Sequence, residues 1–318
     1  MAHAPRRAVA ALGLILTACG GSPPDEPSVD RSASEPVASA PIAETAPITP
    51  EDERAPIAAA ARPEFCALLA GLGQGFGDVA EREVAIAERD DEASIRGVAE
   101  GDLDFALLGR HKVASPIERD VVFHPIGWDA LVVVVHPDNP VDTITSDDLA
   151  RVLLGQVTNW EELGGFDEFL HLYSHEDRAS GIGRMARELL FADASIAAQV
   201  GTVLGPSESP VERVESDPEG LALASRLGAT RHAVKLVAID GTSPTRVNMR
   251  VAGYPLMMPI YLVVRREAGE SVAEFVEFCR GTGQRCVALA GGVGLADGQP
   301  LWAPYRHRMR AAHVRIGR

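Results

Sequence analysis

The chain has 318 residues, of which 46% are hydrophobic and 24% are charged. This length accommodates about two domains, and this composition predicts ordinary globular packing. The formal net charge of −15 argues against nucleic acid or an anionic membrane surface as the main partner.

Residues 1–19 have the pattern of a secretory signal. Arg6 and Arg7 precede the apolar run AVAALGLILTA at residues 8–18, which is too short to span a bilayer. The following LTAC, Leu16 to Cys19, resembles the lipobox of bacterial lipoproteins. The resemblance implies lipidation of Cys19, no other membrane attachment, and a location on the periplasmic or cell-surface face of a bacterial membrane. An ordinary signal with a chance cysteine is the alternative.

Residues 20–61 are predicted to be a disordered tether. They contain eight prolines, eight acidic residues, two basic residues and no aromatic residue. Such a segment cannot bury enough apolar surface to offset the entropy lost on ordering. We therefore expect a semi-extended link between the membrane and a folded body that begins at residue 62.

The body alternates short apolar runs with helical patterns, which favours an α/β fold with largely parallel sheets. Thr145 and Asp148 resemble a capping box in front of LARVLLG, and Gly155 suits the end of that helix. The expected strands are 103–108, 130–135, 171–174, 234–239 and 260–265. The expected helices are 145–154, 184–191 and 272–280.

Three cysteines remain in the body. Cys279 and Cys286 flank the glycine-rich turn RGTGQR, and an oxidising exported compartment favours a disulfide between them. Cys66 lies in the apolar run FCALLAGL and is interpreted as a buried small hydrophobe. Since no Cys/His spacing resembles a metal site, we expect neither a metal nor a cofactor.

The string IGWDALVVVVHPDNPVDTITSDDLARVLLGQVTNWEELGG, residues 126–165, resembles the central region of periplasmic phosphate-binding proteins, the substrate-binding subunits of phosphate ABC importers. HEDRASGIGR at 175–184 is similar to the family's Ser-Gly-Thr phosphate loop. Segments 101–110, 234–264 and 278–295 are similar to further parts of the family, so the resemblance covers roughly residues 65–300.

The resemblance implies a two-lobed α/β periplasmic-binding-protein-like fold with its ligand in the cleft. Two chain crossings, expected near Asp129 and Gly253, would form a hinge. Residues 62–128 and 253–318 would form lobe 1, and residues 129–252 would form lobe 2.

Carried over residue by residue, the family's site implies four ligand-binding residues, Ser180, Gly181, Arg178 and Arg110. Ser180 and Gly181 match the phosphate loop, and Arg178 lies two residues before the serine. The segment Leu108 to Arg110 aligns with the family's carboxylate that accepts a phosphate proton, which leaves Arg110 as either a substitute positive group or a surface residue. Two positions depart from the family: Glu176 stands where an arginine is usual, and Ile182 stands where a threonine is usual.

Two functions follow as hypotheses. The first is an extracytoplasmic solute-binding lipoprotein for phosphate or a related oxyanion, which feeds or signals to an ABC importer, with an ABC permease as its partner. The alternative is a degenerate binding-protein scaffold that acts as an envelope interaction protein without small-ligand binding, because fold alone does not determine function. The scattered histidines have no nucleophile–base spacing, so an enzyme is not expected. A monomer is expected.

Overall fold

The computed structural model describes residues 55–175, 181–191, 201–205 and 208–316. All of these belong to one compact unit, Ile48–Arg318. Cys19, the tether up to residue 54, Arg178 and Ser180 lie outside the described residues. None of the helices in the described ranges combines the length and the apolar character that crossing a bilayer requires.

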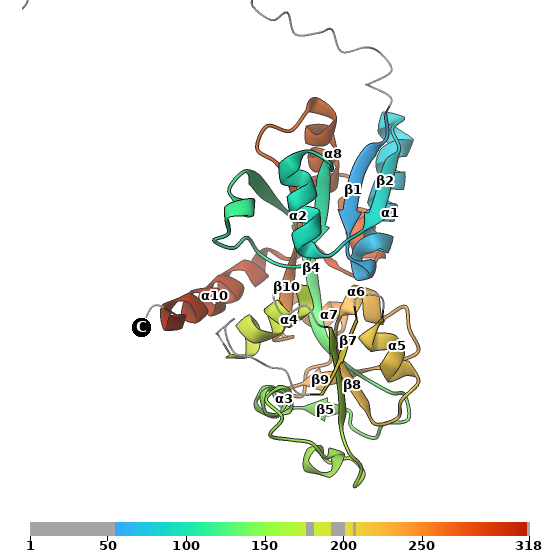
Figure 1. Ribbon diagram of the computed structural model, residues 1–318, viewed down its shortest axis with the longest axis vertical. Coiled ribbons are helices and arrows are strands. Elements are labelled where there is room, and N and C mark those ends of the chain that lie inside the picture. Colours follow the sequence, from blue (N-terminus) through green and yellow to red (C-terminus); the bar gives the residue numbers. More distant parts are fainter. Residues whose placement is uncertain (1–54, 176–180, 192–200, 206–207, 317–318) are drawn as a thin grey trace, which may run out of the picture. The chain divides into compact units, whose positions relative to one another are not determined.

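Strand β4, Val121–Val135, takes part in both halves of an 11-stranded sheet (Figure 1). From Val121 to Ala130 it pairs antiparallel with β10, Met257–Arg265. From Leu131 to Val135 it pairs antiparallel with β8, Gly220–Ser225. Residues 126–135 are all buried. Such a continuous apolar run is typical of a strand that is covered on both faces.

The first half of the sheet has the strand order β2-β1-β3-β10-β4. Its outer strands are parallel, whereas β10 runs antiparallel to both of its neighbours. The outer strands are β1 (Ile57–Ala61), β2 (Val84–Glu88) and β3 (Phe105–Leu108), and β11 (Val293–Gly294) adds to β4. The helices of this half are α1 (Pro63–Ala80), α2 (Asp91–Glu100), α8 (Glu270–Arg280) and α9 (Gln284–Leu289), with a 3-10 turn at Pro116–Glu118.

The tether ends earlier in the structure than the composition predicts, because residues 57–61 form strand β1. The composition predicts disorder up to residue 61, but residues 57–61 pair with both β2 and β3. The prolines and acidic residues all precede Ile57, and the run IAAAA that follows them has no polar side chain. Because this run pairs on both sides and most of its side chains are buried, it is an inner strand, and the folded body begins before residue 62.

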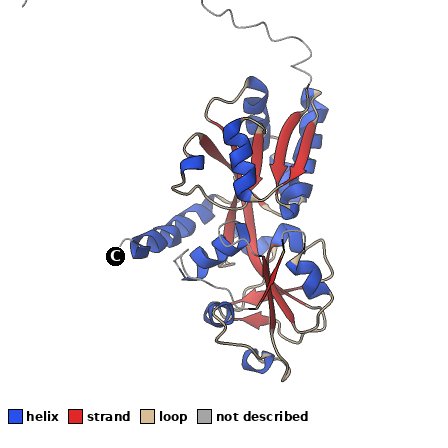
Figure 2. Ribbon diagram, viewed as in Figure 1, coloured by secondary structure: helices blue, strands red, loops and turns tan. Residues whose placement is uncertain are grey.

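The second half continues through β8 to β6 (His171–His175) and β7 (Thr202–Leu204), which run parallel. Strand β9 (Lys235–Ile239) pairs with β4 and with the short β5 (Thr143–Ile144). Figure 2 shows helices around the strands of both halves. Those of the second half are α3 (Ser146–Leu153), α4 (Gly181–Ala186), α5 (Pro210–Glu215), α6 (Arg226–Ala229) and α7 (Arg246–Arg250), with a 3-10 turn at Trp160–Leu163 and a π-helical turn, η4, at Arg187–Phe191.

The C-terminal helix α10, Trp302–Ile316, follows a 3-10 turn at Gln299–Leu301. Leu301 and Tyr305 belong to the same buried cluster as Val132 of β4 and Met185 of α4. The residues after 300, which the resemblance assigns to lobe 1, therefore share a core with the second half of the sheet. The exact lobe boundaries stay a prediction.

Every predicted strand and helix is present, with shifted ends. The Thr145 side chain accepts a hydrogen bond from the Asp148 N–H, and Gly155 follows the helix end with a φ of 69°, so the predicted capping is confirmed. The helix expected at 184–191 begins earlier, at Gly181, and turns π-helical at Arg187. The expectation of largely parallel sheets is wrong at the centre, because β4 and β10 are antiparallel to their neighbours.

Candidate functional site

The candidate site begins at the start of helix α2. Asp90 caps this helix, since its Oδ1 atom accepts a hydrogen bond of 2.7 Å from the Ala93 N–H. An acidic residue in the first helical turn is favourable because it interacts with the positive end of the helix dipole. Asp91, the first residue of α2, is only 1% exposed. Its carboxylate therefore points into the protein, whereas the Asp90 side chain is exposed.

The Oδ2 atom of Asp91 accepts two hydrogen bonds. One comes from the backbone N–H of Gly181 at 2.9 Å, and the other from Nε of Arg110 at 3.2 Å. Gly181 begins α4 and has a φ of 53°, in the left-handed region that favours glycine. Arg110 lies just after β3 in the first half of the sheet, whereas Gly181 begins a helix of the second half. One carboxylate oxygen thus joins two of the residues that the sequence predicts for ligand binding.

Arg110 is buried and has further acceptors. Its Nη2 atom donates to Glu118 Oε1 at 2.9 Å, and its Nη1 atom donates to the His111 carbonyl at 3.0 Å. Glu118 is also buried, and its Oε2 atom accepts the Val113 N–H at 2.6 Å. Because buried charges are stable only when they are paired and hydrogen-bonded, Asp91, Arg110 and Glu118 form one structural network.

The electrostatic balance at Asp91 is set by burial and by two arginines. Burial raises the pKa of the Asp91 carboxyl, whereas the charges of Arg62 and Arg110 oppose that rise. Arg62 precedes helix α1 and forms an ion pair with Glu64, with Nε and Oε1 3.0 Å apart. Its Cδ and Nε atoms lie 3.4 Å from the point where a Cβ atom on Gly181 would stand. The Oδ1 atom of Asp91 is buried without a hydrogen-bond partner among the described residues.

A second polar cluster lies beside this network. Nδ1 of His111 is 2.9 Å from the Tyr305 hydroxyl of α10, and its Nε2 atom is 3.4 Å from Oε2 of Glu188. Glu188 lies in the π-helical turn after α4 and also pairs with Nε of Arg184 at 3.0 Å. The residue after Arg110 thus contacts the same helical segment that Gly181 begins.

The predicted ligand residues have different outcomes. Gly181 and Arg110 meet at one carboxylate, while Ser180, Arg178 and Glu176 lie outside the described residues. Sequence reasoning missed Asp91, which lies in AIAERDDEASIRG at residues 85–97, a segment that lacks the Ser/Gly loop by which the family there contacts its ligand. The usable signal was the pair of aspartates at a helix start, which marks a cap but does not reveal which carboxylate turns inwards.

Cys279, Cys286 and Cys66 are free thiols in the structure, and the disulfide between Cys279 and Cys286 stays a prediction. Cys279 is on α8 and is fully buried in the core of the first half. Cys286 is on α9, and its Sγ atom lies 3.4 Å from the carbonyl oxygen of Gly71 in α1. Both cysteines pack in the same hydrophobic cluster of the first half. Cys66 is half-buried and its Sγ atom contacts the Arg62 carbonyl at 3.3 Å, so it is less buried than expected.

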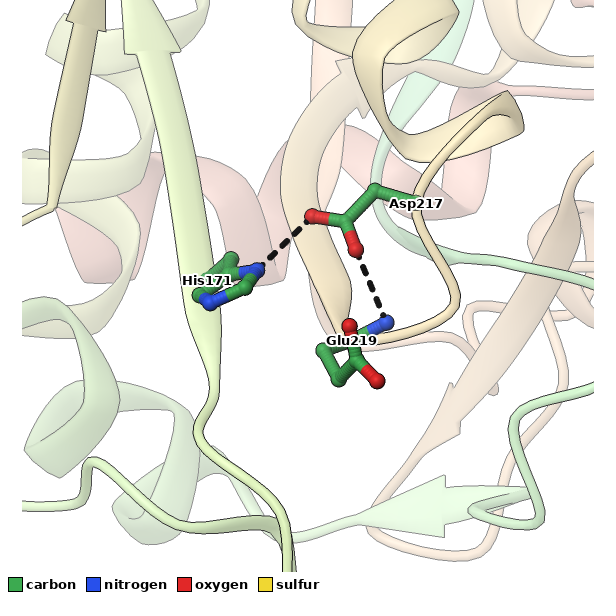
Figure 3. A group of neighbouring side chains, drawn as sticks. All are labelled: His171, Asp217 and Glu219. Atoms are coloured by element: carbon green, nitrogen blue, oxygen red, sulfur yellow. Dashed lines mark hydrogen bonds and ion pairs between the residues drawn. The ribbon is translucent and has the colours of Figure 1, made fainter.

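Figure 3 shows a separate group on the second half, formed by His171, Asp217 and Glu219. One potential ligand atom from each residue lies within 4.8 Å of the others. His171 Nδ1 and Asp217 Oδ2 are 2.9 Å apart, and the Tyr173 hydroxyl donates to the same oxygen at 2.7 Å. The Glu219 N–H donates to Asp217 Oδ1 at 3.1 Å. These contacts describe a hydrogen-bonded carboxylate, that of Asp217, which is held in one orientation.

The described chain is an α/β protein whose two sheet halves are joined through β4, which is the architecture of a two-lobed periplasmic binding protein. The family model described as "PBP superfamily domain" matches residues 49–280. The chain therefore belongs to the PBP superfamily. The predicted family and fold class are confirmed.

Two sequence relatives are each named "Phosphate-binding protein PstS". The protein from Borreliella burgdorferi is 22% identical over 213 residues, which cover 63% of this chain and 76% of the relative. The protein from Bacillus subtilis is 26% identical over 210 residues, which cover 66% of this chain and 63% of the relative. The match therefore spans less than two thirds of the Bacillus subtilis protein. Both names denote binding proteins, in agreement with the expectation that the chain is not an enzyme.

Among solved structures, a putative phosphate ABC transporter substrate-binding protein with bound phosphate from Clostridium perfringens superimposes with a TM-score of 0.69. It is 20% identical in sequence, and the match covers 76% of this chain and 100% of that one. At 20% sequence identity, this structural similarity establishes the fold.

Proposed function

We propose that this chain is an extracytoplasmic solute-binding protein for phosphate or a related oxyanion. One observation carries the proposal. The Gly181 N–H and the Arg110 guanidinium both donate to the same anionic oxygen, Oδ2 of Asp91. A carboxylate and a phosphate present the same kind of acceptor to such donors. The phosphate-binding names of the two sequence relatives support this ligand class.

The delivery route is part of the same proposal. A signal at residues 1–19, a lipid on Cys19 and a tether of about the next 35 residues would hold the folded body near a membrane. In that position the protein would feed an ABC importer or report to it. Ser180 and Arg178 are proposed as additional ligand residues on the resemblance of HEDRASGIGR to the phosphate loop.

Calorimetry on the full-length chain in detergent tests the proposal. Phosphate, a phosphonate, sulfate and an organic phosphate are titrated separately at constant ionic strength. We expect heat of binding with at least one of them, and Ser180→Asp should weaken it because it adds a negative charge beside the Gly181 donor. Ser243→Asp, at an exposed position away from the site, is the matched control and should bind like wild type. Absence of heat with every anion at millimolar concentration contradicts the proposal.

The alternative function, an envelope interaction protein without a small ligand, is favoured by the carboxylate of Asp91 itself. This group already accepts both donors, so the position is occupied by the protein's own chain. A protein partner recovered by cross-linking from intact cells, in equal yield with wild type and Ser180→Asp, would support this alternative. Phosphate-dependent thermal stabilisation of the wild type would count against it.

A further inference from the structure

Asp91 and Gly181 connect segments that are 90 residues apart in the chain. Asp91 begins α2, which packs against strands of the first half of the sheet, whereas Gly181 begins α4, which packs against β8 of the second half. The hydrogen bond between them is buried. A buried polar contact of this kind holds the two segments in one relative position, because breaking it leaves the Gly181 N–H without its acceptor.

The contacts of Asp91 are those that an oxyanion ligand would make. Its Oδ2 atom receives a backbone N–H from a helix start and a guanidinium N–H, and Arg62 adds a second positive charge nearby. Its Oδ1 atom is buried and lacks a hydrogen-bond partner among the described residues. A carboxylate supplied by the chain thus fills an anion position but leaves part of its own hydrogen-bonding capacity unused.

We propose that Asp91 is an internal substitute for the solute, and that its carboxylate competes with an external oxyanion for the Gly181 N–H and Arg110. This inference rests on the proposed function, because it concerns the same donors. Two negative groups cannot share one oxygen position, since each would repel the other and only one can accept the hydrogen bonds. An incoming oxyanion must therefore displace Asp91, which lowers the apparent affinity of the wild-type protein.

Removing the carboxylate makes the competition measurable. In Asp91→Ala the Gly181 N–H and the Arg110 Nε lose their shared acceptor, so the variant should unfold at a lower temperature. A small anion that fits the vacated position should restore the loss. Formate supplies the missing carboxylate, and phosphate supplies the proposed solute. Sodium chloride at matched ionic strength controls for general screening.

The experiment compares thermal unfolding and calorimetry of the full-length wild type, Asp91→Ala and Asp90→Ala. Asp90 is the adjacent exposed cap, so Asp90→Ala loses a helix cap but keeps the Asp91 contacts. We expect formate to raise the unfolding temperature of Asp91→Ala and not that of Asp90→Ala, and phosphate to raise that of Asp91→Ala by more than that of Asp90→Ala. We also expect phosphate to bind Asp91→Ala about tenfold more tightly than wild type, as loss of a competing hydrogen-bonded group of about 1.4 kcal/mol predicts.

The outcomes separate this inference from the proposed function. If neither formate nor phosphate stabilises Asp91→Ala, or if phosphate binds it no more tightly than wild type when the wild type does bind, the inference is wrong. If formate restores Asp91→Ala while phosphate affects no variant, Asp91 fills a carboxylate position and the proposed phosphate function fails. Should Asp91→Ala not fold, Asp91→Asn retains the shape without the charge, and phosphate should again bind it more tightly than wild type.

Discussion

The hydroxyl of Ser225 donates a hydrogen bond to Oδ2 of Asp129 between the paired strands β4 and β8, and both residues are buried. The Leu227 N–H donates to the other carboxylate oxygen at 3.3 Å. Asp129 lies within two residues of the point where β4 exchanges β10 for β8 as its partner. Burial raises its pKa to about 6, although the Ser225 hydrogen bond opposes the rise. A titrating carboxyl thus stands at one of the two expected chain crossings.

Asp129→Asn should change how stability depends on pH. A pKa that is raised in the folded state makes the native protein bind more protons than the unfolded chain between pH 3.8 and about 6. The stabilisation from the neutral acid is therefore complete below pH 3.8 and is lost as the pH rises through 6. The loss amounts to about 3 kcal/mol of unfolding free energy, from 1.36 kcal/mol per pKa unit.

Urea unfolding at pH values from 4 to 8 measures this effect. The free energy of unfolding of wild type should fall relative to that of Asp129→Asn as the pH rises, and the difference should level off above pH 6. Asp102→Asn, at an exposed position, is the control. Parallel pH profiles for wild type and Asp129→Asn would show that Asp129 keeps an ordinary pKa.

Glu118→Ala should destabilise the protein strongly. Glu118 accepts both the Arg110 guanidinium and the Val113 N–H, and its removal leaves Arg110 with a buried, partly unpaired charge. Breaking a buried ion pair on one side costs about 3–5 kcal/mol. The exposed pair of Arg96 and Glu92 on α2 is the control, because Glu92→Ala should cost roughly 0.5 kcal/mol or less. Denaturant unfolding gives both values, and a similar small cost at both positions would contradict the network.

Gly109→Ala should destabilise the protein next to Arg110. A Cβ atom at this position would lie 2.5 Å from Cζ of Phe65, a buried core residue of α1. Overpacking of this kind costs about 1–3 kcal/mol. Gly269→Ala is the matched control, because a Cβ atom there meets nothing within 4 Å. The two unfolding temperatures should differ by several degrees, and equal values would mean that Phe65 moves aside without cost.

Alkylation should distinguish the thiols. Burial raises the pKa of the Cys66 thiol to about 11 and that of Cys279 still further. Because only the thiolate reacts, Cys66 should react about a hundredfold more slowly with iodoacetamide in the native protein at pH 8 than in the unfolded protein. Peptide mass spectrometry of native and urea-unfolded samples measures the two rates. A Cys279–Cys286 disulfide peptide from exported protein would instead support the pairing that the sequence predicts.

The secondary structure was largely predictable because its signals are local. The Thr145 cap and the apolar run before residue 136 depend on residues within a few positions of each other. Strand β1 was missed because five apolar residues follow a long tract of prolines and acids, and composition averaged over that tract hides them. Its burial depends on β3 and β2, which lie farther along the chain.

The family and the fold class were determined by the sequence alone, since the spacing of strands, turns and caps over 126–165 carries them. The resemblance of segments 101–110 and 175–184 to the family also implied that Gly181 and Arg110 belong to one site. Only the tertiary structure showed that the carboxylate of Asp91 lies between Gly181 and Arg110. Asp90 and Asp91 are adjacent and chemically identical, yet one caps a helix in solvent while the other is buried against Gly181. That choice depends on the direction of α2 and on a contact 90 residues away, and no local pattern encodes it.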